Sequence, residues 1–367
     1  MSTNVVNERL AKLTALGTSV WLDQIGRTLI EGGELKRLVD EFSLRGVTSN
    51  PAIFEKAILE SEDYDAEIAA HAADGLTPMQ SYEKIMVKDV KLATDVLRPV
   101  WDSLGGNDGF VSLEVGPSLA RDTSGKTLEE ARSYWQLVDA PNLMIKIPGT
   151  PEGVEYIEEA IYEGININIT LLFSVDRYAD VAEAYIKGLE RRRAEGKSLD
   201  VHSVASFFVS RVDTMVDKQL AEKGRSDLQG KAAIANARAA YVKFKEIFYG
   251  ERFAALREAG APVQRPLWAS TGTKNPAYSE VMYVDTLAGP ETVNTMPVKT
   301  MNAAAEESDV TGVTLDEDPR PVLEELAAAG IDIDAVTAQL LDDGIEAFVH
   351  SLDGLLEGIE KQRAASE

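Results

Sequence analysis

A lysine stands within an otherwise apolar run, residues 143–148 (LMIKIP). If this run is a β-strand, Lys146 faces away from its isoleucine neighbours and points into the fold. Lysine is rarely buried unless it is paired or functional, and burial penalises its ammonium form. Because a neutral amine can attack a carbonyl, Lys146 is a candidate for Schiff-base formation. The alternative is a structural lysine that forms a salt bridge with a buried carboxylate.

The run of residues 165–170 (ININIT) alternates isoleucine with polar residues without a break. In a strand, this pattern places Asn166, Asn168 and Thr170 on one face. If the isoleucines pack against outer helices, the polar row points into the interior, where amides and hydroxyls need polar partners. The row therefore predicts a site for a polar ligand, and a buried network that satisfies itself is the alternative.

Two carboxylates and an amide stand at or near the ends of other apolar runs. Asp23 follows residues 20–22, Asn50 follows residues 47–49, and Glu114 lies within residues 111–115. Each alone is also compatible with a cap or a turn, as Asn50 before a proline illustrates. Together with the amine and the amides, they are the equipment for reversible carbon–carbon cleavage through an imine.

Candidate contacts for the rest of a substrate follow two later runs. Ser206, Phe208 and Arg211 lie within residues 206–211, while Ser270 and Lys274 belong to a loop, residues 270–275, that also contains a glycine. Parallel barrels often hold a phosphate near their last strands, so the hydroxyls and cations here predict an anion subsite.

These residues need a scaffold that brings several strand ends together. Apolar, β-branched runs alternate with amphipathic stretches such as residues 81–101, and eight such units predict an α/β fold, a single (β/α)8 TIM barrel. An open doubly wound sheet is the rival, but no G-x-G-x-x-G motif follows an early strand. The expected strands are Ser19–Leu22, Gly46–Ser49, Phe110–Val115, Leu143–Ile147, Ile165–Phe173, His202–Phe208, Pro266–Ser270 and Thr292–Met296.

Some segments depart from the regular repeat. Residues 55–79 and 213–264 are longer than one helix requires, which predicts extra helices, and residues 321–360 predict two C-terminal helices broken near Gly330 that cover the barrel or one of its mouths. We expect residues 1–367 to form one domain, with its barrel core at about 17–300 and the C-terminal helices at about 319–362. Thr127 with Glu130 predicts a capping box, and Ser174 predicts an N-cap.

Composition excludes several classes of function. The chain has 61 Asp and Glu residues against 37 Lys and Arg, and its formal net charge of −24 repels nucleic acid and anionic membranes. The basic cluster at residues 191–193 fits the solvated end of a helix. With no cysteine and only three histidines, in distant segments, we expect no metal site. No signal peptide or membrane-spanning run is recognisable, so we expect a cytoplasmic protein.

At several of these sites the chain resembles the transaldolase family, the Schiff-base-forming sugar-phosphate transferases of the pentose phosphate pathway. The similar segments are residues 47–51, 111–115, 144–148, 164–174 (GININITLLFS) and 206–213. The resemblance implies a class I aldolase-type barrel with its Schiff-base lysine on the fourth strand, where counting the runs independently places Lys146. It also implies transfer of a dihydroxyacetone unit from sedoheptulose 7-phosphate to glyceraldehyde 3-phosphate, giving erythrose 4-phosphate and fructose 6-phosphate without a cofactor.

The resemblance assigns the chemical steps to four residues. Lys146 would form the imine with the ketose carbonyl, and Glu114 would shuttle protons through a water held by Thr170. Asp23 would take the proton of the C4 hydroxyl as the C3–C4 bond breaks, and would later return a proton to the acceptor aldehyde. These four are the catalytic residues that the resemblance implies.

The resemblance assigns binding to a second group. Asn50, Asn168 and Ser206 would hold the dihydroxyacetone unit, and Arg211 with Ser270 would bind the phosphate. Shorter members of the family carry an arginine soon after the seventh strand, whereas this chain has Lys274 in that region.

Two rival functions belong to the same scaffold. A fructose-6-phosphate aldolase releases dihydroxyacetone, and it is expected to have Gln and Tyr where this chain has Glu114 and Phe208. A silent sugar-phosphate-binding barrel is expected to lack the amine or the proton shuttle. Sugar phosphates are therefore the expected partners, and assembly into a homo-oligomer is compatible with the sequence.

Overall fold

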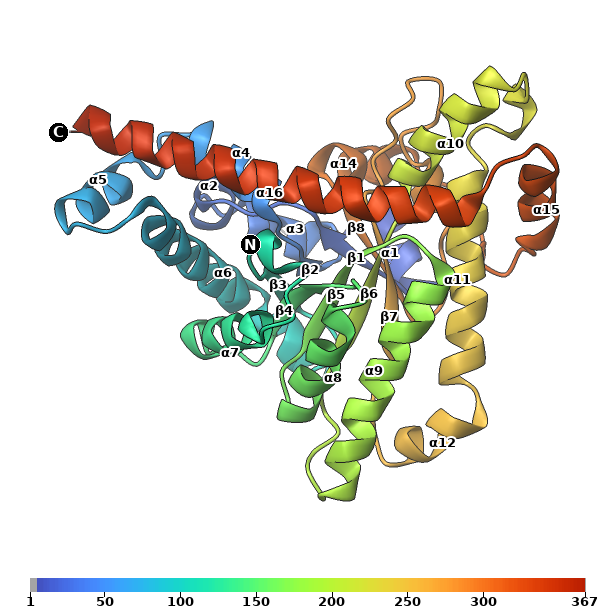
Figure 1. Cartoon of the computed structure of the whole chain (residues 1–367), viewed down its shortest axis with the longest axis horizontal. Helices are drawn as coiled ribbons and strands as arrows, with labels where there is room; N and C mark the ends of the chain where they lie inside the picture. Colours follow the sequence, from blue (N-terminus) through green and yellow to red (C-terminus); the bar gives the residue numbers. More distant parts are fainter. Residues whose placement is uncertain (1–4, 367) are drawn as a thin grey trace.

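Eight parallel strands close into a barrel in a computed structural model that describes residues 5–366 (Figure 1). Each strand pairs with the next along the chain, and β8 returns to pair with β1 through Thr18↔Thr292. The expected (β/α)8 barrel is confirmed. The strands are β1 Thr18–Leu22, β2 Leu44–Val47, β3 Phe110–Glu114, β4 Leu143–Pro148, β5 Ile167–Leu172, β6 Ser203–Phe208, β7 Arg265–Ala269 and β8 Thr292–Met296.

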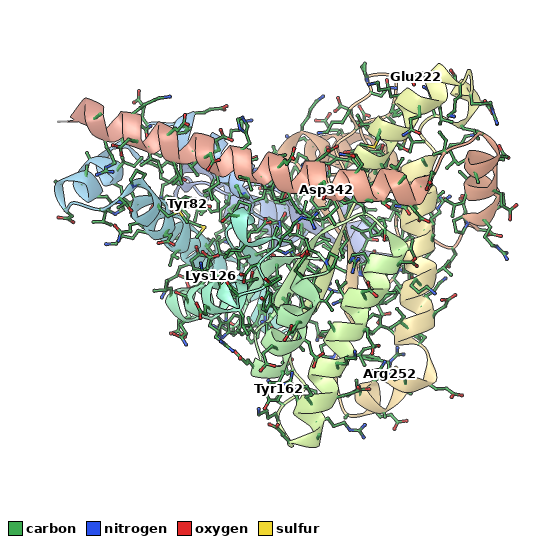
Figure 2. All side chains as sticks on the ribbon, in the orientation of Figure 1. Tyr82, Lys126, Tyr162, Glu222, Arg252 and Asp342 are labelled. Atoms are coloured by element: carbon green, nitrogen blue, oxygen red, sulfur yellow. The ribbon has the colours of Figure 1, made fainter. Side chains whose placement is uncertain are left out.

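Helices connect successive strands around the outside of the barrel. The helices that follow one strand and lead to the next include α3 Glu34–Glu41, α6 Pro78–Ser103, α7 Lys126–Val138, α8 Gly153–Glu163, α9 Val175–Ala194, α11 Ala232–Phe248 and the single turn α13 Met282–Asp285. Helix α1 Glu8–Ala15 precedes β1, and α14 Val298–Glu307 follows β8. In Figure 2, Tyr162 of α8 and Arg252 mark the end at which the strands begin.

The expected extra helices are also present: α4 Pro51–Leu59, α5 Asp65–Ala73, α10 Ser210–Glu222, α12 Glu251–Glu258, α15 Arg320–Ala328 and α16 Ile333–Ser366, with the 3-10 turn η2 Ser226–Leu228. The short helix α2 Arg27–Glu31 and the 3-10 turn η1 Pro117–Leu119 were not expected. Gly330, at a φ of 75°, ends α15 as predicted. The long helix α16 crosses one end of the barrel from α10 toward α5 (Figure 1). None of the helices within residues 5–366 is long and apolar enough to cross a membrane.

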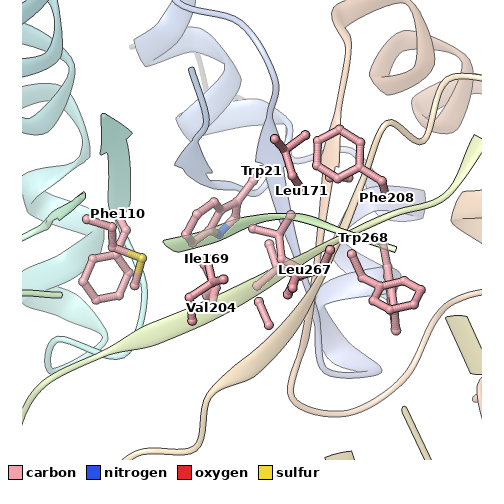
Figure 3. Packing of buried hydrophobic residues seen from close by; sticks show 14 of the residues in the cluster. Trp21, Phe110, Ile169, Leu171, Val204, Phe208, Leu267 and Trp268 are labelled. Atoms are coloured by element: carbon pink, nitrogen blue, oxygen red, sulfur yellow. The ribbon is translucent and has the colours of Figure 1, made fainter. Parts of the chain in front are cut away.

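Buried hydrophobic side chains pack against one another along the strands, Trp21 and Phe110 among them (Figure 3). Trp21 and Phe110 are fully buried there, with their ring centroids 6.4 Å apart. The Trp21 indole N–H donates to Asp108 at 2.9 Å, and Arg265 lies 3.2 Å from the same carboxylate. The indole leaves no space for a side chain on β2, because a Cβ at Gly46 would lie 2.3 Å from its ring. These side chains form a packed floor inside the barrel, and the cavity described below opens above it, at the carboxyl ends of the strands.

Strand β5 departs from the predicted alternation near its end. Leu171 has a φ of 58°, and the register between β5 and β6 shifts between Ile169 and Leu172. This is a β-bulge, and bulges commonly re-aim side chains beside binding sites. The alternation of side chains between the two faces of β5 therefore holds through Thr170 and fails after it.

Two local predictions are wrong, and one is confirmed. The capping box at Thr127 does not form, because α7 Lys126–Val138 already includes Thr127 and its N-cap is Gly125. Glu130 accepts instead from the Gly116 N–H at 2.7 Å. Arg192 is not solvated: it is 9% exposed and its guanidinium donates to the Tyr162 carbonyl at 2.8 Å. Ser174 does cap α9, since its hydroxyl accepts from the Arg177 N–H at 3.0 Å.

The packed floor gives a stability prediction. Gly46→Ala places a methyl group against the fully buried Trp21 indole, and we expect a loss of about 1–3 kcal/mol in the free energy of unfolding. Equilibrium denaturant unfolding followed by far-UV circular dichroism measures it. Gly312→Ala is the matched control, because no atom lies within 4 Å of its Cβ position. Equal effects of the two substitutions would contradict the packing account.

Candidate active site

A cavity of about 110 Å3 opens at the carboxyl ends of the strands. The catalytic and binding residues that the resemblance implies all line it except Glu114 and Asn168, which contact the lining residues Lys146 and Ser206. The lining comes from most of the strands and from α16. It consists of Asp23, Thr48, Asn50, Lys146, Thr170, Ser206, Phe208, Arg211, Ala269, Ser270, Gly272, Lys274, Thr295, Pro297 and Phe348.

Lys146 of β4 reaches the cavity from a nearly dry environment, since only 4% of the residue is exposed. Its Nζ lies 3.1 Å from Glu114 Oε2 and donates to the Ser49 carbonyl at 3.0 Å. Glu114 and Lys146 are register partners on β3 and β4, so the barrel itself sets their separation. Lys146 thus forms the salt bridge expected of a structural lysine, and it also lines the cavity as expected of a Schiff-base lysine.

The Glu114 carboxyl has a raised pKa. Burial raises the pKa of its carboxyl, the ammonium of Lys146 opposes that rise, and the negative charge of Asp23 adds to it. A carboxyl that takes and gives protons readily, within hydrogen-bond reach of an amine, is suited to general acid–base work at that amine.

Asp23 follows β1 and faces the same cavity. Its Oδ1 accepts from the Thr48 hydroxyl at 2.6 Å, and that hydroxyl lies 2.7 Å from Thr295 Oγ1. Burial raises the pKa of Asp23, whereas the hydrogen bond from Thr48 and the positive charges of Lys146, Lys274 and Arg211 lower it. Thr48 thereby orients a carboxylate that can accept a proton from a bound hydroxyl.

A chain of hydrogen bonds forms the base of the cavity. Ser206 donates to Asn168 Oδ1 at 2.6 Å, and the Asn168 amide donates to Ser112 Oγ at 2.9 Å. These bonds fix the orientation of the Asn168 amide and the Ser206 hydroxyl. Asn166 lies outside this set, because its amide binds the carbonyls of Pro141 and Leu143 and is satisfied within the fold.

Two polar residues of the cavity lining, Asn50 and Thr170, have different environments. Asn50 caps α4, with Oδ1 accepting from the Ile53 N–H at 3.0 Å, so its amide N–H groups are available to a ligand. Thr170 is fully buried, and its hydroxyl makes no hydrogen bond within residues 5–366. A buried hydroxyl without a partner beside an active amine is suited to hold a small polar molecule.

Cations gather on the side of the cavity formed by β6 and β7. Arg211 lies on the first turn of α10, Lys274 lies on the loop after β7, and the hydroxyls of Ser210 and Ser270 are 2.9 Å apart. Ser270 has a φ of 55°, a conformation that a non-glycine residue adopts at a cost. Burial lowers the pKa of Arg211, while the negative charges of Asp343 and Asp23 raise it.

Sequence reasoning did not name six residues of the lining as site residues: Thr48, Ala269, Gly272, Thr295, Pro297 and Phe348. Thr48 stands beside Asn50 in a segment already singled out, and Thr295 faces the interior because β8 alternates. Phe348 carries no local signal, because α16 brings it to the barrel from far along the chain.

Comparison with known proteins agrees with this geometry. A family model described as Transaldolase/Fructose-6-phosphate aldolase matches residues 20–359. A protein named Transaldolase from Saccharopolyspora erythraea is 46% identical over 361 residues, which cover 97% of this chain and 98% of the relative. Proteins of the same name from Mycobacterium marinum and Mycolicibacterium paratuberculosis are 46% and 47% identical over 364 residues, with 97% of each chain covered.

The hydrogen bond between Thr48 and Asp23 generates a prediction about pH. Thr48→Val removes a donor that favours the ionised carboxylate, so the pKa of Asp23 rises further. A base must be ionised to accept a proton, and the acidic limb of kcat/KM for carbon–carbon cleavage is therefore expected to move to higher pH. Thr48→Ser keeps the hydroxyl and should preserve the wild-type profile. Identical profiles for all three proteins would remove Asp23 as the base.

Proposed function

The chain belongs to the transaldolase/fructose-6-phosphate aldolase family, and we propose that it acts as a transaldolase. It transfers a dihydroxyacetone unit reversibly from sedoheptulose 7-phosphate to glyceraldehyde 3-phosphate, giving erythrose 4-phosphate and fructose 6-phosphate in the pentose phosphate pathway. The observation that carries the proposal is the buried amine of Lys146, 3.1 Å from the Glu114 carboxyl at the base of the cavity.

The first step joins the amine to the ketose. Nζ of Lys146 attacks the C2 carbonyl, and the proton that the nitrogen loses reaches the carbonyl oxygen through Glu114 and a water held with Thr170. Loss of water from this carbinolamine, with a proton returned by the same carboxyl, leaves a protonated imine. The raised pKa of Glu114 suits it to both directions of this transfer.

The second step breaks the C3–C4 bond. Asp23 accepts the proton of the C4 hydroxyl, the C4 oxygen becomes an aldehyde, and the bonding electrons pass into the imine to form an enamine. Asn50, Asn168 and Ser206 hold the hydroxyls of the three-carbon unit while the aldehyde product leaves. These roles are supported by the hydrogen bonds that fix Asn168 and Ser206 in place.

The third step reverses the second with a new aldehyde. The enamine carbon attacks the acceptor carbonyl, Asp23 returns its proton to the new hydroxyl, and hydrolysis of the imine frees the amine. Arg211, Ser270 and Lys274 bind the phosphate of each sugar at the far side of the cavity. In a protein of net charge −24, local cations are required because salt at about 0.15 M screens the global field over about 8 Å.

Transfer requires that the enamine persist until an aldehyde arrives. Phe208 is 6% exposed, lines the cavity, and presents no hydroxyl that would position a water for protonation. This feature favours the transferase over a fructose-6-phosphate aldolase, which releases free dihydroxyacetone. A non-catalytic sugar-phosphate-binding barrel is disfavoured by the intact pair of Lys146 and Glu114.

The proposal includes the setting of the reaction. We assign the enzyme to the cytoplasm, where the sugar phosphates of this pathway occur, and the steps above require no cofactor. Sugar phosphates are its partners, with no role for nucleic acid. Assembly into a homo-oligomer stays a prediction from the sequence.

A transfer assay tests the function. The protein is incubated with fructose 6-phosphate and erythrose 4-phosphate, and we expect equimolar sedoheptulose 7-phosphate and glyceraldehyde 3-phosphate. Free dihydroxyacetone as the main product would support the aldolase instead. No turnover of the ketose in folded protein would support the non-catalytic barrel.

Phe208 provides a prediction about product ratio. Phe208→Tyr introduces a hydroxyl beside the enamine, and we expect the release of dihydroxyacetone to rise relative to transfer by about a hundredfold, the lower end of what one positioned proton donor contributes. The ratio is measured with and without an aldehyde acceptor. Phe208→Leu is the control without a hydroxyl, and a matching rise in that variant would attribute the change to lost packing.

The cations provide a second prediction. Arg211 can grip a phosphate through two N–H groups, whereas Lys274 acts as a point charge, so we expect Arg211→Ala to cost more than Lys274→Ala. Arg211→Ala should raise KM for glyceraldehyde 3-phosphate by about tenfold to a hundredfold, the scale of a charged hydrogen bond, with a much smaller effect on glyceraldehyde. Equal losses on both acceptors would mean that these residues support the fold.

A further inference from the structure

Arg211 differs from the surface arginines in what holds it. Arg252, for example, binds Glu183 and Glu190 of α9, whereas Arg211 has no hydrogen bond and no carboxylate within 4.0 Å in the described part of the chain. Its contacts are aromatic: its Cζ lies 5.3 Å from the ring centroid of Phe208 and 5.9 Å from that of Phe348. Two rings therefore hold the guanidinium and leave its N–H groups free for an anion.

The second ring comes from a distant element. Phe348 belongs to α16, is 4% exposed, and lines the same cavity as Arg211 and Lys146. One turn earlier on that helix, a Cβ at Gly344 would lie 3.4 Å from Arg211 Nη1 and 3.0 Å from Leu171 Cδ2. The absence of a side chain at this position allows α16 to pass directly over the guanidinium.

The position of α16 is fixed at several points along its length. Asp342, labelled on α16 in Figure 2, forms an ion pair with Arg121 of the segment that follows β3. Toward the C-terminus, α16 lies so close to α4 that a Cβ at Gly358 would be 2.4 Å from Leu59. Phe348 is thus held over the cavity by contacts on both sides of it.

We propose that Phe348 is a positioning residue for the phosphate subsite, which holds the Arg211 guanidinium against Phe208 and makes the enzyme prefer phosphorylated sugars. This inference rests on the proposed function and extends it to α16. An arginine that is free to rotate must lose that freedom when it binds a phosphate. It can also form an ion pair with a nearby carboxylate in place of the phosphate. Asp343 and Asp23 are the carboxylates whose charge acts on Arg211. The two rings hold the guanidinium away from ion pairs with these carboxylates and keep it available to a phosphate.

The test compares acceptors in variants of one ring. Phe348→Leu removes the aromatic face and keeps an apolar side chain, and we expect KM for glyceraldehyde 3-phosphate to rise by about three- to tenfold, the range of one cation–π contact. KM for unphosphorylated glyceraldehyde should stay within about twofold of its wild-type value. The apparent inhibition constant for a neutral competitor should also stay within about twofold of the wild-type value. Phe348→Tyr retains the ring and should restore the wild-type ratio of the two KM values. Inorganic phosphate should inhibit Phe348→Leu more weakly than wild type, by the same factor as the KM change.

Two further variants separate positioning from folding. Leu352→Ala removes a buried side chain one turn along α16 that does not line the cavity, and it should leave the ratio of the two KM values unchanged. In an Arg211→Ala background, Phe348→Leu should add no further change in that ratio, because its effect passes through the guanidinium. A rise in the ratio for Leu352→Ala, or an effect of Phe348→Leu that persists without Arg211, would overturn the inference.

The outcomes also distinguish this inference from the proposed function. If the wild-type protein transfers no dihydroxyacetone unit, the proposed function fails. If the wild type transfers it and Phe348→Leu keeps the wild-type ratio of KM values, only the role of Phe348 fails.

Discussion

A buried amine is the constraint on which the rest of this structure depends. Removing one partner of a buried charged pair typically costs about 3–5 kcal/mol, so Lys146 can lie inside the barrel only if neighbouring strands satisfy it. Glu114 on β3 and the Ser49 carbonyl after β2 do so, at 3.1 and 3.0 Å. Parallel pairing places Glu114 beside Lys146, and it places Asn168 on the other side of the lysine. The closed barrel is therefore what places an amine, a carboxyl and an amide side by side on adjacent strands.

The two ends of the barrel have different tasks. At the end where the strands begin, the Trp21 indole, the Asp108 carboxylate and Arg265 close the interior with packed and hydrogen-bonded side chains. At the opposite end, hydroxyls, amides and cations line a small cavity, and α16 lies across it. Packed side chains at the floor support the strands that carry Lys146 and Glu114, and the proposed reaction requires these two groups to keep their separation through several steps.

Parity along the strands explains why most of the site was predictable from sequence. Lys146, Asn168 and Thr170 stand out because a polar residue at an inward position of an apolar strand requires a partner or a ligand. The bulge at Leu171 was not predictable, since it depends on the register with β6. The burial of Arg192 depends on carbonyl groups contributed by other segments, and the start of α7 before Thr127 depends on contacts outside the helix. The place of Phe348 was unpredictable for the same reason. The helical pattern puts it on an apolar stripe but does not indicate which element that stripe packs against.

Trapping the imine tests the central claim that Lys146 is the reacting amine. The protein is incubated with fructose 6-phosphate and sodium borohydride, and the reduced adduct is located by mass spectrometry of its peptides. We expect a dihydroxyacetone-derived adduct on Lys146 alone, loss of activity in proportion to its formation, and no adduct in Lys146→Met. An adduct on a different lysine, or none in protein that still transfers the three-carbon unit, would contradict the account.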